Sequence, residues 1–286
     1  MIISRLNGGL GNQMFQYAAG RALAQKHRVE LGLDLRIYDG PSQFDFALNH
    51  FAISAKILGD AALPPSRKSN RLRYLLWRSG LIRPYFTDQK QDAFDGKFFE
   101  IRDGAYLRGY WQSERFFLEA AETIAEDFRI KTEPSRENAQ MAAKIRNVNA
   151  VSFHIRRGDY VSDTKANTTH GVCSLDYYEQ ALAHLTANRQ DATEVFVFSD
   201  DPAWAHENLR ISLPRTIVDI NDSDHQYEDL RLMSLCKHNI IANSSFSWWG
   251  AWLNRAPDKT IIAPKEWFRD TSKKNPDICP PDWIRI

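Results

Sequence analysis

Two consecutive arginines in the middle of the chain have the type and position of residues that bind a phosphorylated ligand. Arg156 and Arg157 follow directly after the apolar run 151–155. Alternation along a strand places His154 and Arg156 on one face, at the carboxyl end of that strand. A guanidinium is permanently charged and bidentate, which suits a pyrophosphate, and a nearby imidazole can add a hydrogen bond. The alternative is that the two arginines are solvated surface residues, with Asp159 as the partner of one of them. The ligand site is favoured because the arginines interrupt an apolar strand at the place where ligands bind.

A second polar group follows the apolar run 195–198. Asp201-Pro202 is a typical helix start, so part of this signal is helix initiation. Asp200 is a candidate for binding guanine, because one carboxylate can accept both N1–H and N2–H₂. A metal-binding acidic pair is the least favoured interpretation, since an arginine-rich site can neutralise a pyrophosphate without Mg²⁺.

Hydroxyl side chains gather between an apolar run at 239–242 and a helical segment at 246–254. Ser244, Ser245 and Ser247 offer neutral donors to phosphate or sugar oxygens at a helix N-terminus. An ordinary helix cap is an equally good role for Ser244 or Ser245. The three tryptophans of this helix are expected in the core or at a domain interface, rather than stacked on a sugar.

A glycine-rich turn joins the first apolar run, at 2–6, to a helix at about 12–26. Glycines let the backbone approach a ligand, and the free N–H groups of a helix N-terminus favour a phosphate or another anion. A tight turn in which Asn12 caps the helix is the alternative.

The same turn partly matches a dinucleotide-binding fingerprint. Gly9 and Gly11 fit that pattern, and Asp34 closes the next strand about 20 residues further on. Met14 stands where the third glycine is needed for close packing against a pyrophosphate. An NAD-dependent oxidoreductase is therefore an alternative, and a non-enzymatic carbohydrate-binding protein is another because the chain is rich in aromatic residues.

Composition bounds the class of protein. The chain has 286 residues, of which 43% are hydrophobic and 26% charged, so it can bury a sizeable core and is not intrinsically disordered. The formal net charge of +1 excludes a global basic field for nucleic acid or an anionic membrane, and any anion must be bound locally. Three cysteines without a CxxC pair suggest neither a disulfide framework nor a zinc site. No signal peptide or apolar run of 18 residues occurs, which indicates a soluble intracellular protein.

Short apolar runs alternate with amphipathic segments, which predicts an α/β fold with parallel sheets and right-handed crossovers. We predict an N-terminal Rossmann-like domain over 1–140 and a C-terminal one over 150–286, whose last residues are candidates for packing back on the first domain. For residues 40–100, the sequence pattern predicts only scattered helices. The predicted strands are 2–6, 29–34, 105–108, 151–155, 195–198, 216–218, 239–242 and 260–263, and further helices are predicted at 114–128, 175–187, 202–208 and 225–237.

Four ordered motifs carry a family resemblance. They are GGLGNQMFQYAAGRALA, HIRRGDYV, FVFSDDPAW and EDLRLMSLCKHNIIANSSFSWWGAWLN. Together they resemble glycosyltransferase family eleven, the α-1,2-fucosyltransferases. The resemblance implies a GT-B fold of two Rossmann-like domains facing across a cleft. It also implies a GDP-β-L-fucose donor and transfer of fucose, with inversion, to the 2-hydroxyl of a terminal galactose, without a metal or other cofactor.

The resemblance also implies roles for single residues. Arg156 would hold the β-phosphate as charge builds on the leaving GDP, with Arg157 and His154 in support. Asn12 lies in a loop that would close over the donor. The candidate donor-binding residues are Gly11, Asn12, Gln13, His154, Arg156, Arg157, Asp200, Ser244, Ser245 and Ser247.

The catalytic base is open between two residues. Asp159 and His170 are candidates to take the proton of the acceptor hydroxyl. A transition state with strong oxocarbenium character would need little help from a base, and Asp159 is alternatively a structural partner of Arg157. The catalytic candidates are thus Arg156, Asp159, His154 and His170.

The acceptor is expected to be a galactose-terminated oligosaccharide held by 1–140, with acceptor choice in loops within 35–115. No nucleic-acid partner is expected. The absence of an N-terminal anchor in the sequence suggests a bacterial, cytoplasmic enzyme of surface-polysaccharide biosynthesis. It would act on a lipid-linked repeat unit, with peripheral association at the inner membrane.

Overall fold

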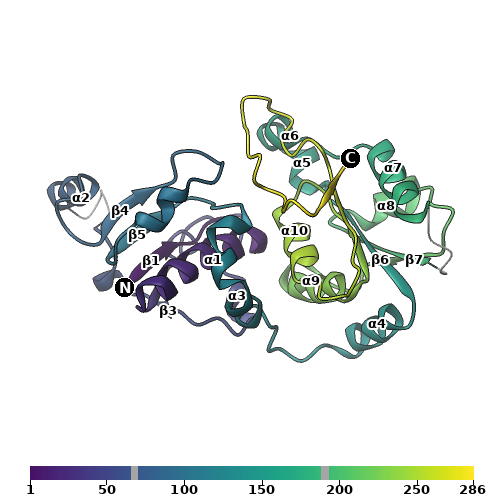
Figure 1. Cartoon of the computed structure of the whole chain (residues 1–286), viewed down its shortest axis with the longest axis horizontal. Coiled ribbons are helices and arrows are strands. Elements are labelled where there is room, and N and C mark those ends of the chain that lie inside the picture. Colours follow the sequence, from purple (N-terminus) through teal and green to yellow (C-terminus); the bar gives the residue numbers. More distant parts are fainter. Residues whose placement is uncertain (66–69, 188–192) are drawn as a thin grey trace. The chain divides into compact units, whose positions relative to one another are not determined.

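The computed structural model describes residues 1–65, 70–187 and 193–286. The chain divides into two compact units. The N-terminal unit consists of residues 1–131 with 275–278, and the C-terminal unit of 132–274 with 279–286. Residues 66–69, which belong to the segment predicted to choose the acceptor, lie outside the described residues. Figure 1 shows a sheet flanked by helices in each unit.

The N-terminal unit has a parallel sheet that, within its described residues, contains five strands in the order β3-β2-β1-β5-β4. Helix α1 (Leu10–His27) makes the crossover from the first strand to the second. The strands are β1 (Ile2–Arg5), β2 (Leu31–Asp34), β3 (Lys56–Ile57), β4 (Tyr85–Asp88) and β5 (Ala105–Arg108).

Helix α1 packs closely on this sheet because its apolar stripe and a glycine face the strands. The stripe predicted from the sequence is confirmed: Phe15, Ala18, Ala19, Ala22 and Leu23 are all buried. A Cβ at Gly20 would lie 2.9 Å from Leu31 and 3.0 Å from Ser4, so only glycine allows this approach. The helix begins after Gly9 and not at Asn12, so the prediction of an Asn12 cap was wrong.

Two predictions in the N-terminal unit failed. Residues 40–100 hold strands β3 and β4 besides helix α2 (Arg71–Arg78), whereas only helices were expected there. The helix expected at 114–128 is two 3₁₀ turns followed by α3 (Ala121–Asp127). Phe117 interrupts it with a non-helical backbone (φ −140°), because its fully buried ring packs against Phe15.

The C-terminal unit has a parallel sheet whose described strands run in the order β11-β10-β9-β6-β7-β8. The strands are β6 (Asn149–Ile155), β7 (Thr193–Ser199), β8 (Arg215–Val218), β9 (His238–Ile240), β10 (Ile261–Ala263) and β11 (Ile284–Arg285). The helices are α4 (Arg136–Arg146), α5 (Gly158–Ser162), α6 (Thr164–His170), α7 (Leu175–Thr186), α8 (Pro202–Asn208), α9 (Gln226–Leu235) and α10 (Ser245–Trp252).

Both faces of the C-terminal sheet are buried. Phe153 of β6 packs with α7 residues such as Ala181 on one face, while Phe196 of β7 packs with α4 and α9 on the other. Buried parallel strands explain why this half of the sequence has such regular apolar runs. Trp248 and Trp249 are fully buried, which confirms the prediction of a place in the core for two of the three tryptophans of α10, whereas Trp252 is only partly buried.

The C-terminal segment returns to the N-terminal unit over a few residues. Asn275 donates a hydrogen bond to the carbonyl of Gln112 (2.8 Å), and Asp277 pairs with Arg115 (2.6 Å). The chain then re-enters the C-terminal unit and adds β11 to its sheet. No helix in the described part of the chain is both long and apolar enough to cross a membrane.

Candidate active site

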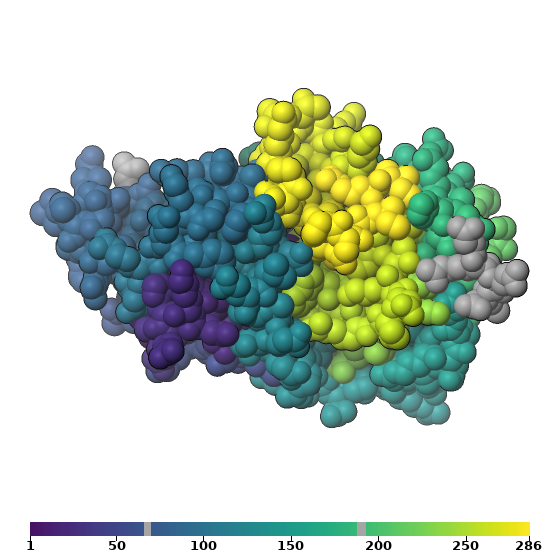
Figure 2. Space-filling view, viewed as in Figure 1, coloured from purple at the N-terminus to yellow at the C-terminus, as the bar shows by residue number. Residues whose placement is uncertain are grey.

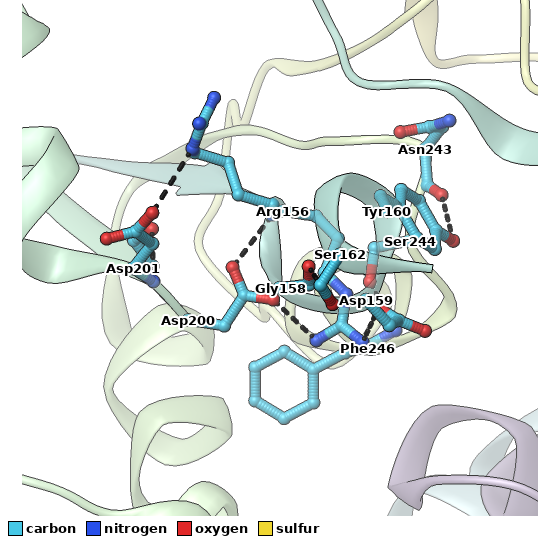
Figure 3. Close-up of polar contacts among 12 residues, drawn as sticks. Arg156, Gly158, Asp159, Tyr160, Ser162, Asp200, Asp201, Asn243, Ser244 and Phe246 are labelled. Carbon is cyan, nitrogen blue, oxygen red and sulfur yellow. Dashed lines mark hydrogen bonds and ion pairs between the residues drawn. The ribbon is translucent and has the colours of Figure 1, made fainter. Parts of the chain in front are cut away.

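Arg156 stands at the carboxyl end of β6 and is held by two carboxylates. Its Nη2 lies 2.6 Å from Asp159 Oδ1, and its Nη1 lies 2.9 Å from Asp200 Oδ2 (Figure 3). Strands β6 and β7 pair with Ile155 opposite Ser199. This register brings the residues after each strand together, although they are 44 positions apart in the chain. The guanidinium is thereby fixed in orientation at the edge where parallel sheets bind ligands.

Arg157 turns toward α8 instead. Its guanidinium lies 3.9 Å above the ring of Trp204, and its Nε is 3.3 Å from Asp201 Oδ2 (Figure 3 shows Asp201). The suggested pairing of Asp159 with Arg157 is therefore wrong, because Asp159 pairs with Arg156 and Arg157 with Asp201. Arg156 and Arg157 have separate surroundings.

Asp200 has no free oxygen atom in this structure. One oxygen holds Arg156, and the other accepts a hydrogen bond of 2.8 Å from the backbone N–H of Arg157. A Cβ at Gly158 would lie only 2.5 Å from Asp200 Oδ2, so a glycine is required for this approach. A contact between Asp200 and guanine would have to displace one of these bonds. The structure gives the residue the role of positioning Arg156.

His154 is buried beneath Arg156 and is neutral. Burial and the charge of Arg156 lower the pKa of its imidazole to about 3. Its ring centroid lies 5.8 Å from that of Phe246, and its Nδ1 has no hydrogen-bond partner among the described residues. An imidazole with such a low pKa is a poor proton acceptor, so its geometry suits a support for Arg156 better than a base.

His170 ends α6 and stacks on Tyr160. The two ring planes differ by 3°, with centroids 4.8 Å apart. Burial lowers the pKa of His170, while the nearby charge of Asp159 opposes this effect. The two candidate bases, Asp159 and His170, are thus electrostatic neighbours. Which of them takes a proton stays a prediction.

The serines at the start of α10 are partly occupied with the helix itself. Ser244 is the N-cap, and its Oγ accepts a hydrogen bond of 3.3 Å from the Phe246 N–H (Figure 3). The buried Ser247 donates to the Ser244 carbonyl (3.4 Å), and Ser245 is the first helical residue. Strand β9, which precedes them, pairs directly with β6. The serines therefore follow a strand adjacent to that of Arg156, and contacts with phosphate stay a prediction.

In the N-terminal unit, the loop predicted to close over the nucleotide-sugar donor is stabilised by contacts of its own side chains. Gly8 has φ +82°, and a Cβ there would lie 2.8 Å from Asn12 Nδ2. Asn12 Oδ1 accepts from Gln112 Nε2 (2.8 Å). Gln13 is fully buried and uses its amide on three backbone groups, those of Gly8, Asp45 and Ala47. The side chain of Gln13 thus shapes the loop; Gly11 lies in the first turn of α1.

A group of residues at the carboxyl ends of β1 and β5 escaped the sequence analysis. The side chain of Asn7 donates to the hydroxyl of Tyr110 (3.2 Å), and Tyr110 is 42% exposed. Gln89 Oε1 accepts from the backbone N–H groups of Tyr110 (2.8 Å) and Trp111 (2.9 Å), which holds Trp111 at φ +54°. The sequence did contain a signal for these residues, because GYWQ directly follows the predicted strand 105–108, where parallel sheets bind ligands.

Among the residues that the structure describes, no group of three or more His, Cys, Asp or Glu side chains could hold a metal ion. The charges of the site are instead those of the two arginines and three aspartates after β6 and β7. A ligand at Arg156 would meet its guanidinium.

Comparison with known proteins decides the family. The model of "Glycosyl transferase family 11" matches residues 1–286. The chain belongs to glycosyl transferase family 11. It is 35% identical over 294 residues to an alpha-1,2-colitosyltransferase of Escherichia coli, covering 100% of this chain and 99% of that protein. It is 28% identical over 256 residues to galactoside alpha-(1,2)-fucosyltransferase 2 of Bos taurus, covering 86% of this chain and 67% of that one.

The fold is shared with a solved structure of a FUT1 mutant from Arabidopsis thaliana in complex with GDP. The TM-score is 0.54, at 10% identity, over 93% of this chain and 71% of that chain. This likeness concerns the fold alone. The family 11 chain has the predicted α/β fold of GT-B type, with two Rossmann-like domains.

Membership of family 11 makes the chain a glycosyltransferase. The surroundings of Asp34 also argue against the alternative of an NAD-dependent oxidoreductase. Asp34 is buried, receives two hydrogen bonds from the Arg36 guanidinium (2.7 and 3.0 Å) and accepts another from the Tyr106 hydroxyl (2.7 Å). These partners hold the pKa of the Asp34 carboxyl below its usual range. The carboxylate belongs to the sheet and is not available to a ribose.

Asp229 is a further candidate that the sequence analysis did not single out. It lies in the first turn of α9, which follows β8, and accepts from Asn221 Nδ2 (2.7 Å). Burial raises the pKa of its carboxyl to about 7. A carboxyl with a pKa near neutrality at the ligand-binding edge of a sheet is a candidate binding group.

Proposed function

We propose that this family 11 glycosyltransferase moves L-fucose from GDP-β-L-fucose to the 2-hydroxyl of a terminal galactose, with inversion and without a metal. The observation that carries the proposal is the doubly held guanidinium of Arg156 at the end of β6. The name of a similar protein supports it, that of a galactoside α-1,2-fucosyltransferase of Bos taurus. We place the reaction in the cytoplasm, in surface-polysaccharide biosynthesis.

The charges around Arg156 suggest how the donor binds. Two arginines face three aspartates there, Asp159, Asp200 and Asp201, so the site has no excess positive charge without a ligand. A diphosphate therefore competes with a carboxylate for Arg156. Asp159 is the partner to be displaced, because Asp200 is also anchored by the backbone of Arg157. The β-phosphate then takes the place of Asp159 on the guanidinium.

This exchange links donor binding to the chemistry. The acceptor O2 attacks the anomeric carbon, and the bond from that carbon to the β-phosphate oxygen breaks. Arg156 stabilises the added charge on GDP, an effect that usually contributes about 10²–10³ in rate. The released Asp159 carboxylate, next to His170, is then free to take the proton from the acceptor hydroxyl.

The acceptor is assigned to the N-terminal unit. The carboxyl edge of its sheet carries the exposed ring of Tyr110 and the amides of Asn7 and Gln112. Neutral amides and an aromatic ring suit the hydroxyls and the apolar face of a galactose.

Colitosyl transfer is a second candidate. The chain is more similar to the colitosyltransferase, at 35% identity, than to the bovine fucosyltransferase, at 28%. Colitose is fucose without its 3-hydroxyl, so both nucleotide sugars present the same diphosphate to Arg156. The distinction between them depends on contacts with one hydroxyl group of the sugar.

The test is a transfer assay with GDP-fucose and GDP-colitose at equal concentration, on an array of galactose-terminated oligosaccharides. We expect product from GDP-fucose, with an α-1,2 linkage in the NMR spectrum and undiminished activity in EDTA. The matched control acceptor is the same oligosaccharide with a 2-deoxygalactose terminus, which should remain unmodified. Transfer from GDP-colitose alone would replace the first candidate by the second, and fucosylation of the 2-deoxy acceptor would refute the assigned linkage.

A further inference from the structure

Helix α2 of the N-terminal unit has an unusual distribution of polar and apolar side chains. Its segment, residues 70–84, contains four arginines and no acidic residue, in a chain whose formal net charge is only +1. Figure 2 shows the residues around 70–90, in blue, at one end of the N-terminal unit. The segment therefore concentrates positive charge in a molecule that is otherwise close to neutral.

The helix is attached to the unit by one face. Trp77 is buried, and its ring packs against Phe86 of β4 (5.1 Å between centroids) and Tyr106 of β5 (5.3 Å). Tyr74 packs against the same cluster. These contacts define which side of α2 faces the sheet.

The opposite face of α2 is apolar and exposed. Leu72 is 70% exposed, Leu75 is 54% exposed and Leu76 is 37% exposed. Their i, i+3, i+4 spacing puts them in one arc of about 100° on the helix, with Trp77 on the other side. Leu81, 73% exposed, follows the end of the helix. Leu72, Leu75 and Leu76 thus form a solvent-facing stripe on α2.

Arginines border this stripe on both sides. At about 100° per residue, Arg71 and Arg78 lie beside Leu75, and Arg73 lies beside Leu76. The guanidinium of Arg78 stacks on the ring of Phe86 at 3.8 Å. Within the described ranges, none of these three arginines makes an ion pair with an acidic side chain. The charges of Arg71 and Arg73 remain available to a partner.

We propose that α2 docks the protein on an anionic phospholipid surface. We call the surface formed by Leu72, Leu75, Leu76, Arg71 and Arg73 the α2 face. Its leucines enter the boundary between headgroups and acyl chains, and the flanking arginines contact lipid phosphates. A helix with exposed leucines bordered by basic residues has the composition of helices that lie in a membrane interface. The absence of acidic residues favours lipid phosphate over a protein surface of mixed charge.

Other exposed apolar residues do not form such a surface. Leu118 is 54% exposed and Leu175 is 38% exposed, but each belongs to a different element. Isolated exposed leucines are ordinary in soluble proteins, whereas contiguous apolar patches mark interaction sites. These residues serve as matched controls for the leucines of α2.

The test is sedimentation of the full chain with vesicles of phosphatidylglycerol and phosphatidylethanolamine, compared with vesicles of phosphatidylcholine alone. We expect binding to the anionic vesicles that weakens at high salt, because surface charges are screened. The sedimentation assay needs neither donor nor acceptor, so its outcome is independent of the proposed fucosyltransferase activity.

Variants locate the binding surface. The triple variant Leu72→Gln/Leu75→Gln/Leu76→Gln should lower the vesicle partition coefficient at least ~100-fold, since each leucine loses its transfer into the interface. Arg71→Gln/Arg73→Gln should lower it ~10-fold or more at low salt. The controls Leu118→Gln and Arg129→Gln/Arg136→Gln should bind like the wild type. The KM for the nucleotide sugar should be unchanged in the α2 variants.

Three outcomes would overturn the proposal. The first is a wild-type protein that does not bind anionic vesicles, and the second is binding that survives the triple leucine change. The third is a dimer in light scattering that the leucine variant abolishes, which would assign the stripe to a second copy of the chain. Equal melting temperatures of the wild type and the variants would show that all of them are folded.

Discussion

The two units of the protein build similar parallel sheets but carry different chemistry at the carboxyl edges. The edge of the C-terminal unit holds charged residues: Arg156 with Asp159 and Asp200, and Arg157 with Asp201. The edge of the N-terminal unit also has charged residues, but they pair with one another, Asp34 with Arg36 and Asp88 with Arg108. Beside these pairs lie neutral groups, in which Asn7 bonds to Tyr110 and Asn12 to Gln112. Similar backbones thus present an arginine with carboxylates after β6 in one unit, and amides with an exposed aromatic ring after β1 and β5 in the other.

The topology of a sheet therefore fixes where a ligand binds, whereas the side chains after the strands decide which ligand it is. A permanent cation at a strand end suits a diphosphate, while neutral donors and an exposed ring suit sugar hydroxyls. We therefore assign the nucleotide to the C-terminal unit and the acceptor to the N-terminal unit. Substitutions that act on one substrate only are the way to test this division.

The largest expected effect comes from Arg156→Ala. We expect a loss of about 10²–10³ in kcat/KM, because the charge of the leaving GDP loses its counter-ion. Steady-state transfer kinetics measure the loss, and Arg156→Lys should recover part of it. Arg129→Ala, an exposed arginine elsewhere, is the control. Near-normal turnover of a folded Arg156→Ala protein would remove the central assignment.

The second prediction concerns stability against pH and the buried His154. Its folded-state pKa of about 3 lies below its ordinary value of 6.5, so unfolding is accompanied by proton uptake below pH 6.5. The contribution of this group to stability is complete above pH 6.5 and is lost as the pH falls toward 3. Between pH 6.5 and pH 5, the free energy of unfolding that His154 contributes falls by about 2 kcal/mol.

The measurement is urea unfolding at both pH values. His154→Leu should lose less stability over this interval than the wild type does, and the exposed His184→Gln should behave like the wild type. An unchanged pH dependence in His154→Leu would contradict a neutral buried imidazole.

Asp200→Asn should have an intermediate effect. The Arg156 guanidinium loses one charged partner while the backbone contact of residue 157 can be retained, so we expect kcat/KM to fall about tenfold. Inhibition by GDP and by pyrophosphate should change by the same factor. A selective loss of GDP binding would instead support a contact between Asp200 and guanine. Asp201→Asn, which keeps a good helix cap, is the control.

The smallest effect is expected at the carboxyl edge of the N-terminal sheet. Tyr110→Ala should raise the KM for the acceptor about fivefold, since one aromatic contact is lost. The KM for the nucleotide sugar should not change. Tyr110→Phe, which keeps the ring, separates stacking from the hydroxyl contact with Asn7. An increase in the donor KM of Tyr110→Ala would break the division between the two edges.

The sequence predicted the C-terminal unit well because its strands are buried on both faces. Runs such as 151–155 and 195–198 are continuous and apolar, and the polar residues after them mark the strand ends. The same rule would have found Tyr110 after β5. In the N-terminal unit, β3 has two exposed residues and β4 is half-buried, so neither carries a recognisable pattern.

The family, the alternation of strands and helices, and the position of Arg156 at a strand end all follow from the order of the amino acids. Which carboxylates hold Arg156 depends on the tertiary structure. Asp200 reaches it through the pairing of β6 with β7, and Asp159 through the turn into α5. The tertiary structure also exposed the leucines of α2, because Trp77 takes the buried face. Local patterns report which residues prefer burial, whereas partners distant in the chain depend on the register of strands and the packing of side chains.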